Sequence, residues 1–165
     1  MDTCSRVSIP SFDAAGNLPE GRHPASVQDV RKVLVDGFAS SRTRSAIFDY
    51  WSHHREALLE LVEVHRQWLA GSFTSDKPDP ADVDVITVLD GLAFDELPRH
   101  RQLLVRMLID GHYTEEFWNC DAYPVLVYPQ GHPGHNKYVV ASQRWEDYFG
   151  YDRDGNARGF VEVSS

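Results

Sequence analysis

The fold of this chain can be worked out from one segment, Gly71-Ser72-Phe73-Thr74-Ser75-Asp76-Lys77-Pro78-Asp79-Pro80-Ala81-Asp82-Val83-Asp84-Val85. It combines a Gly-Ser step, a polar loop and an alternating Asp-Val start of a strand. Side chains at i and i+2 of a strand point the same way, so Asp82 and Asp84 are expected on one face and both valines on the other. Two carboxylates about 4 Å apart repel by about 4 kcal/mol at an effective dielectric of 20. A divalent cation turns that repulsion into binding.

The composition is that of an ordinary globular protein. The chain has 165 residues, of which 42% are hydrophobic, and this suffices for one domain with its own core. The formal net charge is −9 and there is no long run of Lys or Arg, which argues against binding extended duplex nucleic acid through phosphate neutralisation. A small phosphorylated ligand held through a metal ion is compatible with this charge.

Cysteine content and hydropathy indicate the compartment. Cys4 and Cys120 are the only cysteines and lie far apart, so a disulfide framework is not expected and a reducing compartment fits. No apolar run approaches about 18 residues, and no signal pattern opens the chain. We therefore expect a cytoplasmic protein without a membrane segment.

The hydrophobic pattern predicts the order of elements. Residues 1–25 are turn-rich and are expected to form an arm, not a packed element, lying on a single domain of residues 26–165. Ser26 and Thr114 are expected as helix caps. The predicted helices cover about 26–37, 45–63 and 98–109, with one helical turn at 113–118. Strands are predicted at 67–70, 83–89, 122–128 and near 160–163, with a surface loop at 130–136 and a strand-like start passing into a short helix at 138–146. Pro124 favours an edge position or a bulge for its strand, and the order predicts an α/β (α+β) sheet with helices mainly on one side.

The spacing between the Gly-Ser step and the acidic pair resembles the signature of the DNA polymerase β-like nucleotidyltransferase superfamily. There a strand ends in Gly-Gly or Gly-Ser, and an Asp-hydrophobic-Asp/Glu pair follows at the start of the next. The minimal nucleotidyltransferases carry Pro-Asp-x-Asp-hydrophobic-Asp, which the segment 78–84 matches with one extra residue. The chain is also similar to a small branch of that superfamily, through Ile9-Pro10-Ser11-Phe12-Asp13, Gly16-Asn17-Leu18-Pro19, Gly71-Ser72-Phe73 and Phe149-Gly150-Tyr151-Asp152-Arg153-Asp154-Gly155.

The resemblance implies a minimal nucleotidyltransferase fold, a small mixed sheet flanked by helices, that moves an NMP from an NTP to a hydroxyl. ATP is the expected NTP. Asp82 and Asp84 would hold two Mg²⁺ or Mn²⁺ ions that bridge the triphosphate, and the family expects a third carboxylate on a neighbouring strand. Asp121 is its match by position. The backbone of Gly71 and the hydroxyl of Ser72 would contact the phosphates.

One departure from the family concerns phosphate binding. Many relatives carry an arginine shortly after the Gly-Ser, where this chain has Phe73-Thr74-Ser75. Thr74 and Lys77 are therefore the expected substitutes. This departure favours a rival interpretation, in which the chain is a degenerate nucleotidyltransferase that binds a nucleotide or a partner without catalysis.

The acceptor stays open. A protein side chain, as in antitoxin-type relatives, a tRNA 3′ end and a small molecule are the alternatives, and the first would place the chain in a toxin–antitoxin or phage-defence setting. The length leaves no room for a separate acceptor-binding domain. A partner protein or an oligomer is therefore expected to supply that surface.

Other patterns carry weaker predictions. His132 and His135 match no closed four-ligand zinc spacing. Residues 152–156 begin like a calcium loop, but the glycine stands at the fourth position instead of the sixth. The tryptophans are expected in the core, although Trp145 and Tyr148 could lie near a nucleotide.

Overall fold

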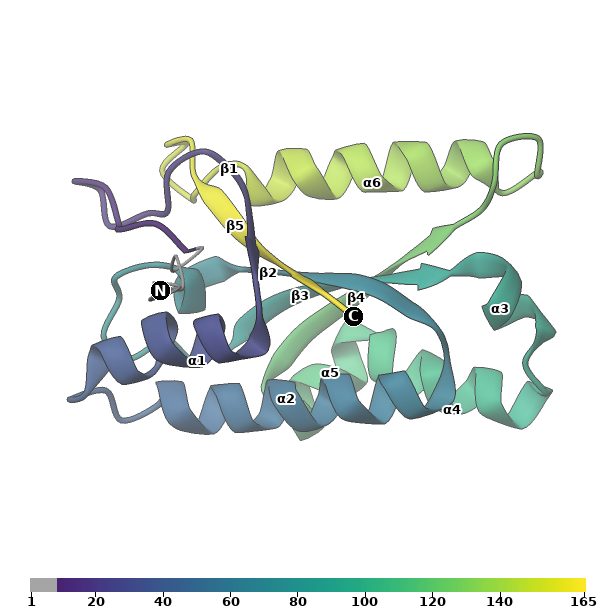
Figure 1. Ribbon diagram of the computed structural model, residues 1–165, viewed down its shortest axis with the longest axis horizontal. Coiled ribbons are helices and arrows are strands. Elements are labelled where there is room, and N and C mark those ends of the chain that lie inside the picture. The colour runs from purple at the N-terminus through teal and green to yellow at the C-terminus, as the bar shows by residue number, and fades with distance from the viewer. Residues whose placement is uncertain (1–8) are drawn as a thin grey trace, which may run out of the picture.

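A mixed five-stranded sheet forms the middle layer of the molecule (Figure 1). The structure is a computed structural model that describes residues 9–165, so Cys4 lies outside the described part. The strand order is β1-β5-β2-β3-β4. The strands are β1 (Gly21–Ala25), β2 (Val64–Ala70), β3 (Val83–Asp90), β4 (Cys120–Val127) and β5 (Gly159–Ser164).

Strand pairing explains why the sheet is mixed. β2 pairs antiparallel with β3 and with β5, whereas β1–β5 and β3–β4 are parallel pairs. β4 lies at the edge of the sheet, as Pro124 predicts, because an edge strand has one side without ladder partners. The predicted α/β class is confirmed.

Helices cover the two faces unequally (Figure 1). One face carries α1 (Val27–Leu34), α2 (Arg44–Leu61), α4 (Arg99–Ile109) and α5 (Gly111–Trp118), and the other carries α6 (His135–Phe149). The short elements are α3 (Gly91–Glu96) after β3 and the 3-10 turns η1 (Asp36–Phe38) and η2 (Gly71–Thr74). Within residues 9–165, no helix is long and apolar enough to cross a membrane.

Side chains of β3 alternate between two hydrophobic cores. Val83 and Val85 are fully buried on the face covered by α1 and α2. Ile86 is buried on the opposite face, where it belongs to the same cluster as Phe149 of α6. Because successive side chains of a strand point to opposite faces, Asp84 lies on the α6 face.

Most helices form where the sequence predicts them. α1 begins after Ser26, which forms a capping box with Asp29. α2 and α4 match their predicted ranges to within two residues. The cap of α5 is Asp110, because Thr114 is buried inside that helix and its hydroxyl faces the carbonyl of Asp110.

The structure corrects the sequence interpretation at two places. The strand-like start expected at 138 is wrong, because residues 135–149 form a single helix. This helix buries Phe149 fully and leaves its other side chains at least partly exposed, so few buried positions mark it as a helix. The expected arm contains β1, which pairs with β5, and Leu18, which is fully buried. Part of the arm is therefore a packed element.

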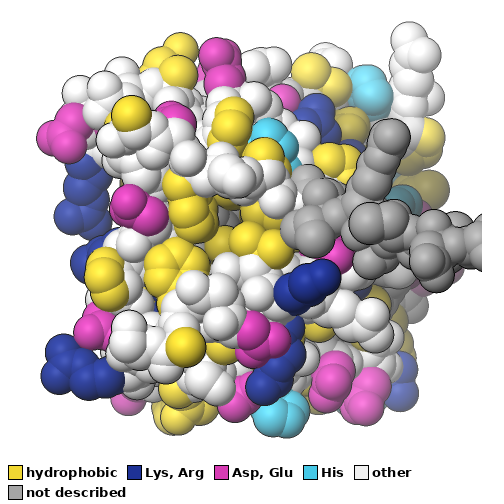
Figure 2. Space-filling view, turned by 60° about the vertical axis from the view of Figure 1, so that its left-hand side comes forward, with side chains coloured by type: hydrophobic (Ala, Val, Ile, Leu, Met, Phe, Trp, Pro, Cys, Tyr) yellow, Lys and Arg dark blue, Asp and Glu magenta, His cyan; other side chains and the backbone are white. Residues whose placement is uncertain are grey.

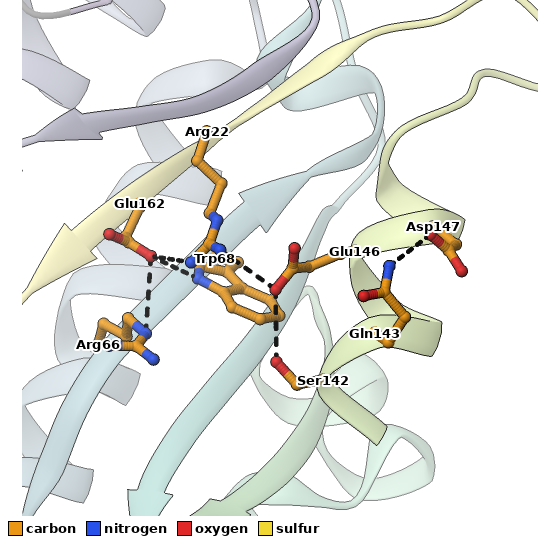
Figure 3. A network of polar contacts seen from close by, with 8 residues as sticks. All are labelled: Arg22, Arg66, Trp68, Ser142, Gln143, Glu146, Asp147 and Glu162. Carbon is orange, nitrogen blue, oxygen red and sulfur yellow. Dashed lines mark hydrogen bonds and ion pairs between the residues drawn. The ribbon is translucent and has the colours of Figure 1, made fainter. Parts of the chain in front are cut away.

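A network of polar contacts holds α6 against the sheet (Figure 3). Glu162 of β5 accepts a hydrogen bond of 2.8 Å from the indole of Trp68 and lies 3.3 Å from the guanidinium of Arg22. Arg22 also contacts Glu146 of α6 at 3.3 Å. These contacts join β1, β2, β5 and α6, and they fix the helix that faces Asp84.

Candidate functional site

Two carboxylates meet where β3 and β4 begin. Asp84 and Asp121 are each the second residue of their strand, and the parallel register places them directly opposite each other. Neighbouring strands lie about 4.8 Å apart, so the two side chains are neighbours on the α6 face. Asp82 precedes β3, and its charge acts on Asp84. Asp82, Asp84 and Asp121 are called the acidic triad below.

Gly71 follows the end of β2 directly beside this triad. Ala70, the last residue of β2, pairs with Asp84, and Gly71 follows with a φ of +77°. A Cβ at Gly71 would lie 2.2 Å from a carboxylate oxygen of Asp84, which is far inside contact distance. Both the backbone conformation and the neighbouring carboxylate therefore require glycine here.

Crowded negative charge perturbs Asp84. Burial raises the pKa of Asp84 to about 6 by disfavouring the charged form, and the charges of Asp82 and Asp121 add to the effect. Arg158 and Arg153 oppose it. A bound cation would therefore favour the charged form of the Asp84 carboxylate and offset the repulsion from its neighbours.

The donor atoms at the acidic triad are all oxygens, which suits Mg²⁺ or Mn²⁺. The triad is not a tight cluster. Among residues 9–165, the three side chains whose ligand atoms all come within 4.8 Å of one another are Glu63, His65 and Asp90, at the opposite end of β2 and β3.

The loop 71–77, called the Gly-Ser loop, continues from β2. Ser72 is half-buried, and its carbonyl accepts hydrogen bonds from the amide and hydroxyl of Ser75. Thr74 is buried and donates its hydroxyl to the carbonyl of Gly71 at 3.2 Å, so its hydroxyl proton is used within the loop. Lys77 is exposed. Among the predicted phosphate ligands, Gly71 contacts Asp84 of the triad. Ser72 is the next residue in the chain, and Thr74 is buried within the loop.

Arg44 lies beneath the Gly-Ser loop, and no sequence motif marks it. This first residue of α2 is fully buried. Its guanidinium donates hydrogen bonds of 2.7–2.9 Å to the carbonyls of Leu34, Phe73, Ser75 and Lys77. Burial lowers the pKa of Arg44 to about 10. Its charge is used to hold the loop and does not face the triad.

A cavity of about 550 Å³ opens onto Asp84 and Asp121, within the usual range for small-ligand sites. The remaining lining residues come from β4 and α6, namely Tyr123, Arg144, Trp145, Asp147, Tyr148 and Phe149. Figure 2, turned so that the end with the α6–β5 connection comes forward, shows apolar side chains gathered in a hollow with charged side chains of both signs around it. The cavity thus has an acidic end and an aromatic wall.

Tyr123 joins the two parts of this cavity. Its ring stacks on Trp145 with centroids 5.0 Å apart and an interplanar angle of 25°. It follows Asp121 by two residues on β4, so the two share a face, and a Cβ at Gly111 would meet the Tyr123 hydroxyl and an Asp121 oxygen at 2.8 and 2.7 Å. Burial raises the pKa of Tyr123, and its hydrogen bond with Asp121 adds to this. The i+2 spacing is the sequence signal that could have identified it.

Comparison with known proteins identifies one family. A model for a family of unknown function (DUF6932) matches residues 10–164. No curated protein and no solved structure matches the chain.

Proposed function

The chain belongs to the DUF6932 family of unknown function, and we propose that it is a divalent-metal-dependent nucleotidyltransferase. It transfers an NMP unit from an NTP, in the first instance ATP, to a hydroxyl group. The observation that carries the proposal is the register of Asp84 and Asp121 on parallel strands beside Gly71. A cavity of ligand size opens onto the two carboxylates.

The order of the site along the chain supports a polymerase β-like arrangement. β2 runs into Gly71-Ser72, the antiparallel strand β3 carries Asp84 as its second residue, and β4, parallel to β3, carries Asp121 as its second residue. A solvated Asp-x-Asp at a strand start would need neither a glycine pressed against it nor a third carboxylate in register. Both features are found, and the minimal nucleotidyltransferase fold is part of the proposal.

The proposed reaction exchanges one phosphorus–oxygen bond for another. The acceptor oxygen bonds to the α-phosphorus, the bond to the bridging oxygen breaks, and diphosphate leaves. The acidic triad would hold two Mg²⁺ or Mn²⁺ ions, which neutralise the triphosphate and stabilise the attacking and leaving oxygens. Asp121 accepts the proton of the acceptor hydroxyl, since it faces the cavity and Tyr123 orients it.

The Gly-Ser loop contributes to phosphate binding. The absence of a Cβ at Gly71 lets the backbone approach an anion, and the Ser72 hydroxyl adds a donor. Exposed Lys77 is free to turn toward the phosphates from the solvent side. Thr74 has no part in the proposed site, because its hydroxyl is bonded to the carbonyl of Gly71.

The acceptor is a protein side chain, a tRNA 3′ end or a small molecule. The net charge of −9 favours the first and the last over a large RNA. The cavity accommodates one nucleotide-sized group, so a partner protein or a second copy would supply the rest of the acceptor surface. We place the activity in the cytoplasm, in a toxin–antitoxin or phage-defence setting.

The test is incorporation of label from α-phosphate-labelled NTPs into cell lysate in the presence of Mg²⁺. The wild type is expected to label an acceptor, and the Asp82→Ala/Asp84→Ala variant is expected to show no signal. A matched control is Glu56→Ala/Glu60→Ala, which removes two exposed carboxylates from α2 and should label as the wild type does.

Two other outcomes have definite meanings. If the wild type labels nothing more than the double variant while MgATP raises its melting temperature, the chain is a nucleotide-binding module without catalysis. If MgATP neither labels nor stabilises the wild type, the acidic triad is not a nucleotide site.

A further inference from the structure

A second cavity lies beside the one that opens onto Asp84 and Asp121. Its volume is about 690 Å³, which is within the usual range for small-ligand sites. Tyr123, Arg144 and Trp145 line both cavities, so the two cavities meet at these three side chains. The first is called the triad cavity below, and the second is called the α6 cavity.

One face of α6 forms most of the wall of the α6 cavity. Residues spaced i, i+3, i+4 and i+7 lie on one side of a helix, and this spacing is that of Lys137, Val140, Ala141 and Arg144. Tyr123 of the edge strand β4 completes the wall. Val140 is apolar and yet 68% exposed. The α6 cavity therefore offers apolar surface to a ligand that enters from the solvent.

The charge of the α6 cavity is opposite to that of the whole chain, which carries −9. Lys137 and Arg144 line it, and none of its lining residues, all in the described part of the chain, is Asp or Glu. Within residues 9–165, neither of these cations has an ion-pair partner. Two unpaired cations beside an apolar surface favour a ligand that joins an apolar body to an anionic group.

Tyr123 and Trp145 shape the junction of the two cavities. Their rings stack with centroids 5.0 Å apart, and Tyr123 is 37% exposed, so a planar group in the α6 cavity has an aromatic surface to pack against. Tyr123 also makes a hydrogen bond with Asp121, the proposed proton acceptor. A hydroxyl group held at this junction would therefore lie next to Asp121.

We propose that the α6 cavity binds the acceptor, and that the acceptor is a small molecule with a planar apolar body, an anionic group and a hydroxyl. The inference rests on the proposed nucleotidyltransferase function and names the class of its second substrate. The NTP occupies the triad cavity, while Lys137 pairs with the anionic group of the acceptor. Arg144 lines both cavities and is available to an anion in either. A partner surface is needed only for macromolecular acceptors.

The transfer step balances without a further reactant. The acceptor oxygen bonds to the α-phosphorus of the NTP, its proton passes to Asp121, and diphosphate leaves as the bond to the bridging oxygen breaks. The two ligands reach this point from opposite sides of the junction, because the acidic residues line the triad cavity alone and Lys137 lines the α6 cavity alone.

Binding of a fluorescent dye tests the α6 cavity without any turnover. The probes are 8-anilinonaphthalene-1-sulfonate and its uncharged counterpart N-phenyl-1-naphthylamine. Val140→Trp places a bulky ring in the α6 cavity and should weaken both dyes about tenfold or more. Lys137→Glu should weaken the sulfonate to a similar extent, about tenfold, and leave the uncharged dye unchanged.

Two exposed residues outside both cavities supply the matched controls. Val139→Trp makes the same change one position earlier on α6, at a side chain that is 48% exposed. Lys32→Glu reverses the same charge on α1, which covers the opposite face of the sheet. Both control variants should bind the two dyes as the wild type does.

Transfer of label from α-labelled ATP tests the acceptor class. The acceptor source is cell lysate from which protein and nucleic acid have been removed by ultrafiltration. The wild type is expected to form a labelled small molecule in this filtrate. Val140→Trp and Lys137→Glu should form it about tenfold more slowly at limiting filtrate concentration, whereas Val139→Trp should match the wild type.

The outcomes separate this inference from the function on which it rests. If the wild type labels only protein or nucleic acid in whole lysate, or if Val140→Trp matches Val139→Trp in dye binding and transfer, the inference is wrong while the proposed function stands. If the wild type labels nothing in either preparation, the proposed function fails and the acceptor role fails with it. All four substituted side chains are exposed, so the variants are expected to fold.

Discussion

At the scale of single residues, Gly71 and Asp84 show how a backbone position and a charged group depend on each other. The carboxylate of Asp84 occupies the space that any side chain at position 71 would need. The charge is costly where it stands, since burial and two neighbouring aspartates raise its pKa to about 6. Such a cost is typical of sites that are stabilised by a ligand.

Gly71→Ala tests this dependence. The new Cβ would stand 2.2 Å from an oxygen of Asp84 and would require a positive φ, so we expect displaced Asp84, lost divalent-cation binding and reduced stability. Gly155→Ala is the control, because Gly155 has a φ of +81° and nothing within 4 Å of its Cβ position. The Gly155→Ala variant should lose only the free energy of unfolding that a left-handed alanine costs, about 1–2 kcal/mol. Equal unfolding free energies and intact Mn²⁺ binding in both variants would show that a side chain at position 71 does not displace Asp84.

Asp84→Asn tests the electrostatic cost. The pKa of Asp84 rises from 3.8 to about 6 on folding, so between these pH values the folded protein holds a proton that the unfolded chain has lost. Stability therefore falls as the pH rises through this window. The shift corresponds to a cost on the order of 3 kcal/mol above it. The asparagine variant should be more stable than the wild type at pH 7.5 without divalent ions.

Urea unfolding in EDTA measures this effect, and the gap between Asp84→Asn and the wild type should close as the pH falls below 3.8, the lower of the two pKa values. Taking the difference cancels the other titrating groups, such as buried His54, whose pKa burial lowers. A gap that is independent of pH would mean that the carboxylate is not the cause.

At the scale of elements, the Gly-Ser loop is held from below by α2 and from the side by the 13–17 turn. Arg44 donates charged hydrogen bonds to the carbonyls of residues 73, 75 and 77. Asn17 and Gly16 bond the same loop from the side. The loop therefore has a fixed shape before any ligand binds.

Arg44→Met is expected to destabilise the protein by about 3 kcal/mol or more, because four carbonyls lose a charged donor. Hydrogen exchange should become faster in residues 72–77. Arg42→Met is the comparison, since Arg42 makes an exposed pair with Asp79, and such pairs contribute about 1 kcal/mol or less. Similar losses for both variants would show that Arg44 does not organise the loop.

Local pattern predicted the elements that carry strong periodicity and missed those that depend on distant contacts. α2 has a clear apolar stripe, and β3 has alternating valines, so both were predicted. β1 has only five residues and exists because it pairs with β5, more than 130 residues later. α6 buries only Phe149 fully, and its N-cap Gly134 makes no side-chain cap, so neither a set of buried positions nor a cap residue marked it as a single helix.

At the scale of the whole molecule, the site combines groups from distant parts of the chain. Gly71, Asp82 and Asp84 lie close together in the sequence, and Asp121 directly precedes a predicted strand. Spacing was therefore enough to select these four residues. α2 brings Arg44 beneath the Gly-Ser loop, and α6 brings Trp145 and Tyr148 to the cavity wall. No spacing rule relates these groups, because their approach depends on how the layers pack.

The central claim is that the acidic triad holds two divalent ions together with an NTP. Anomalous diffraction from crystals grown with Mn²⁺ and a non-hydrolysable ATP analogue tests it most directly. We predict two manganese peaks about 3.5–4 Å apart among Asp82, Asp84 and Asp121, with the nucleotide in the cavity that opens onto Asp84 and Asp121. Manganese absent from the triad, or present only at the cluster of Glu63, His65 and Asp90, would contradict the account.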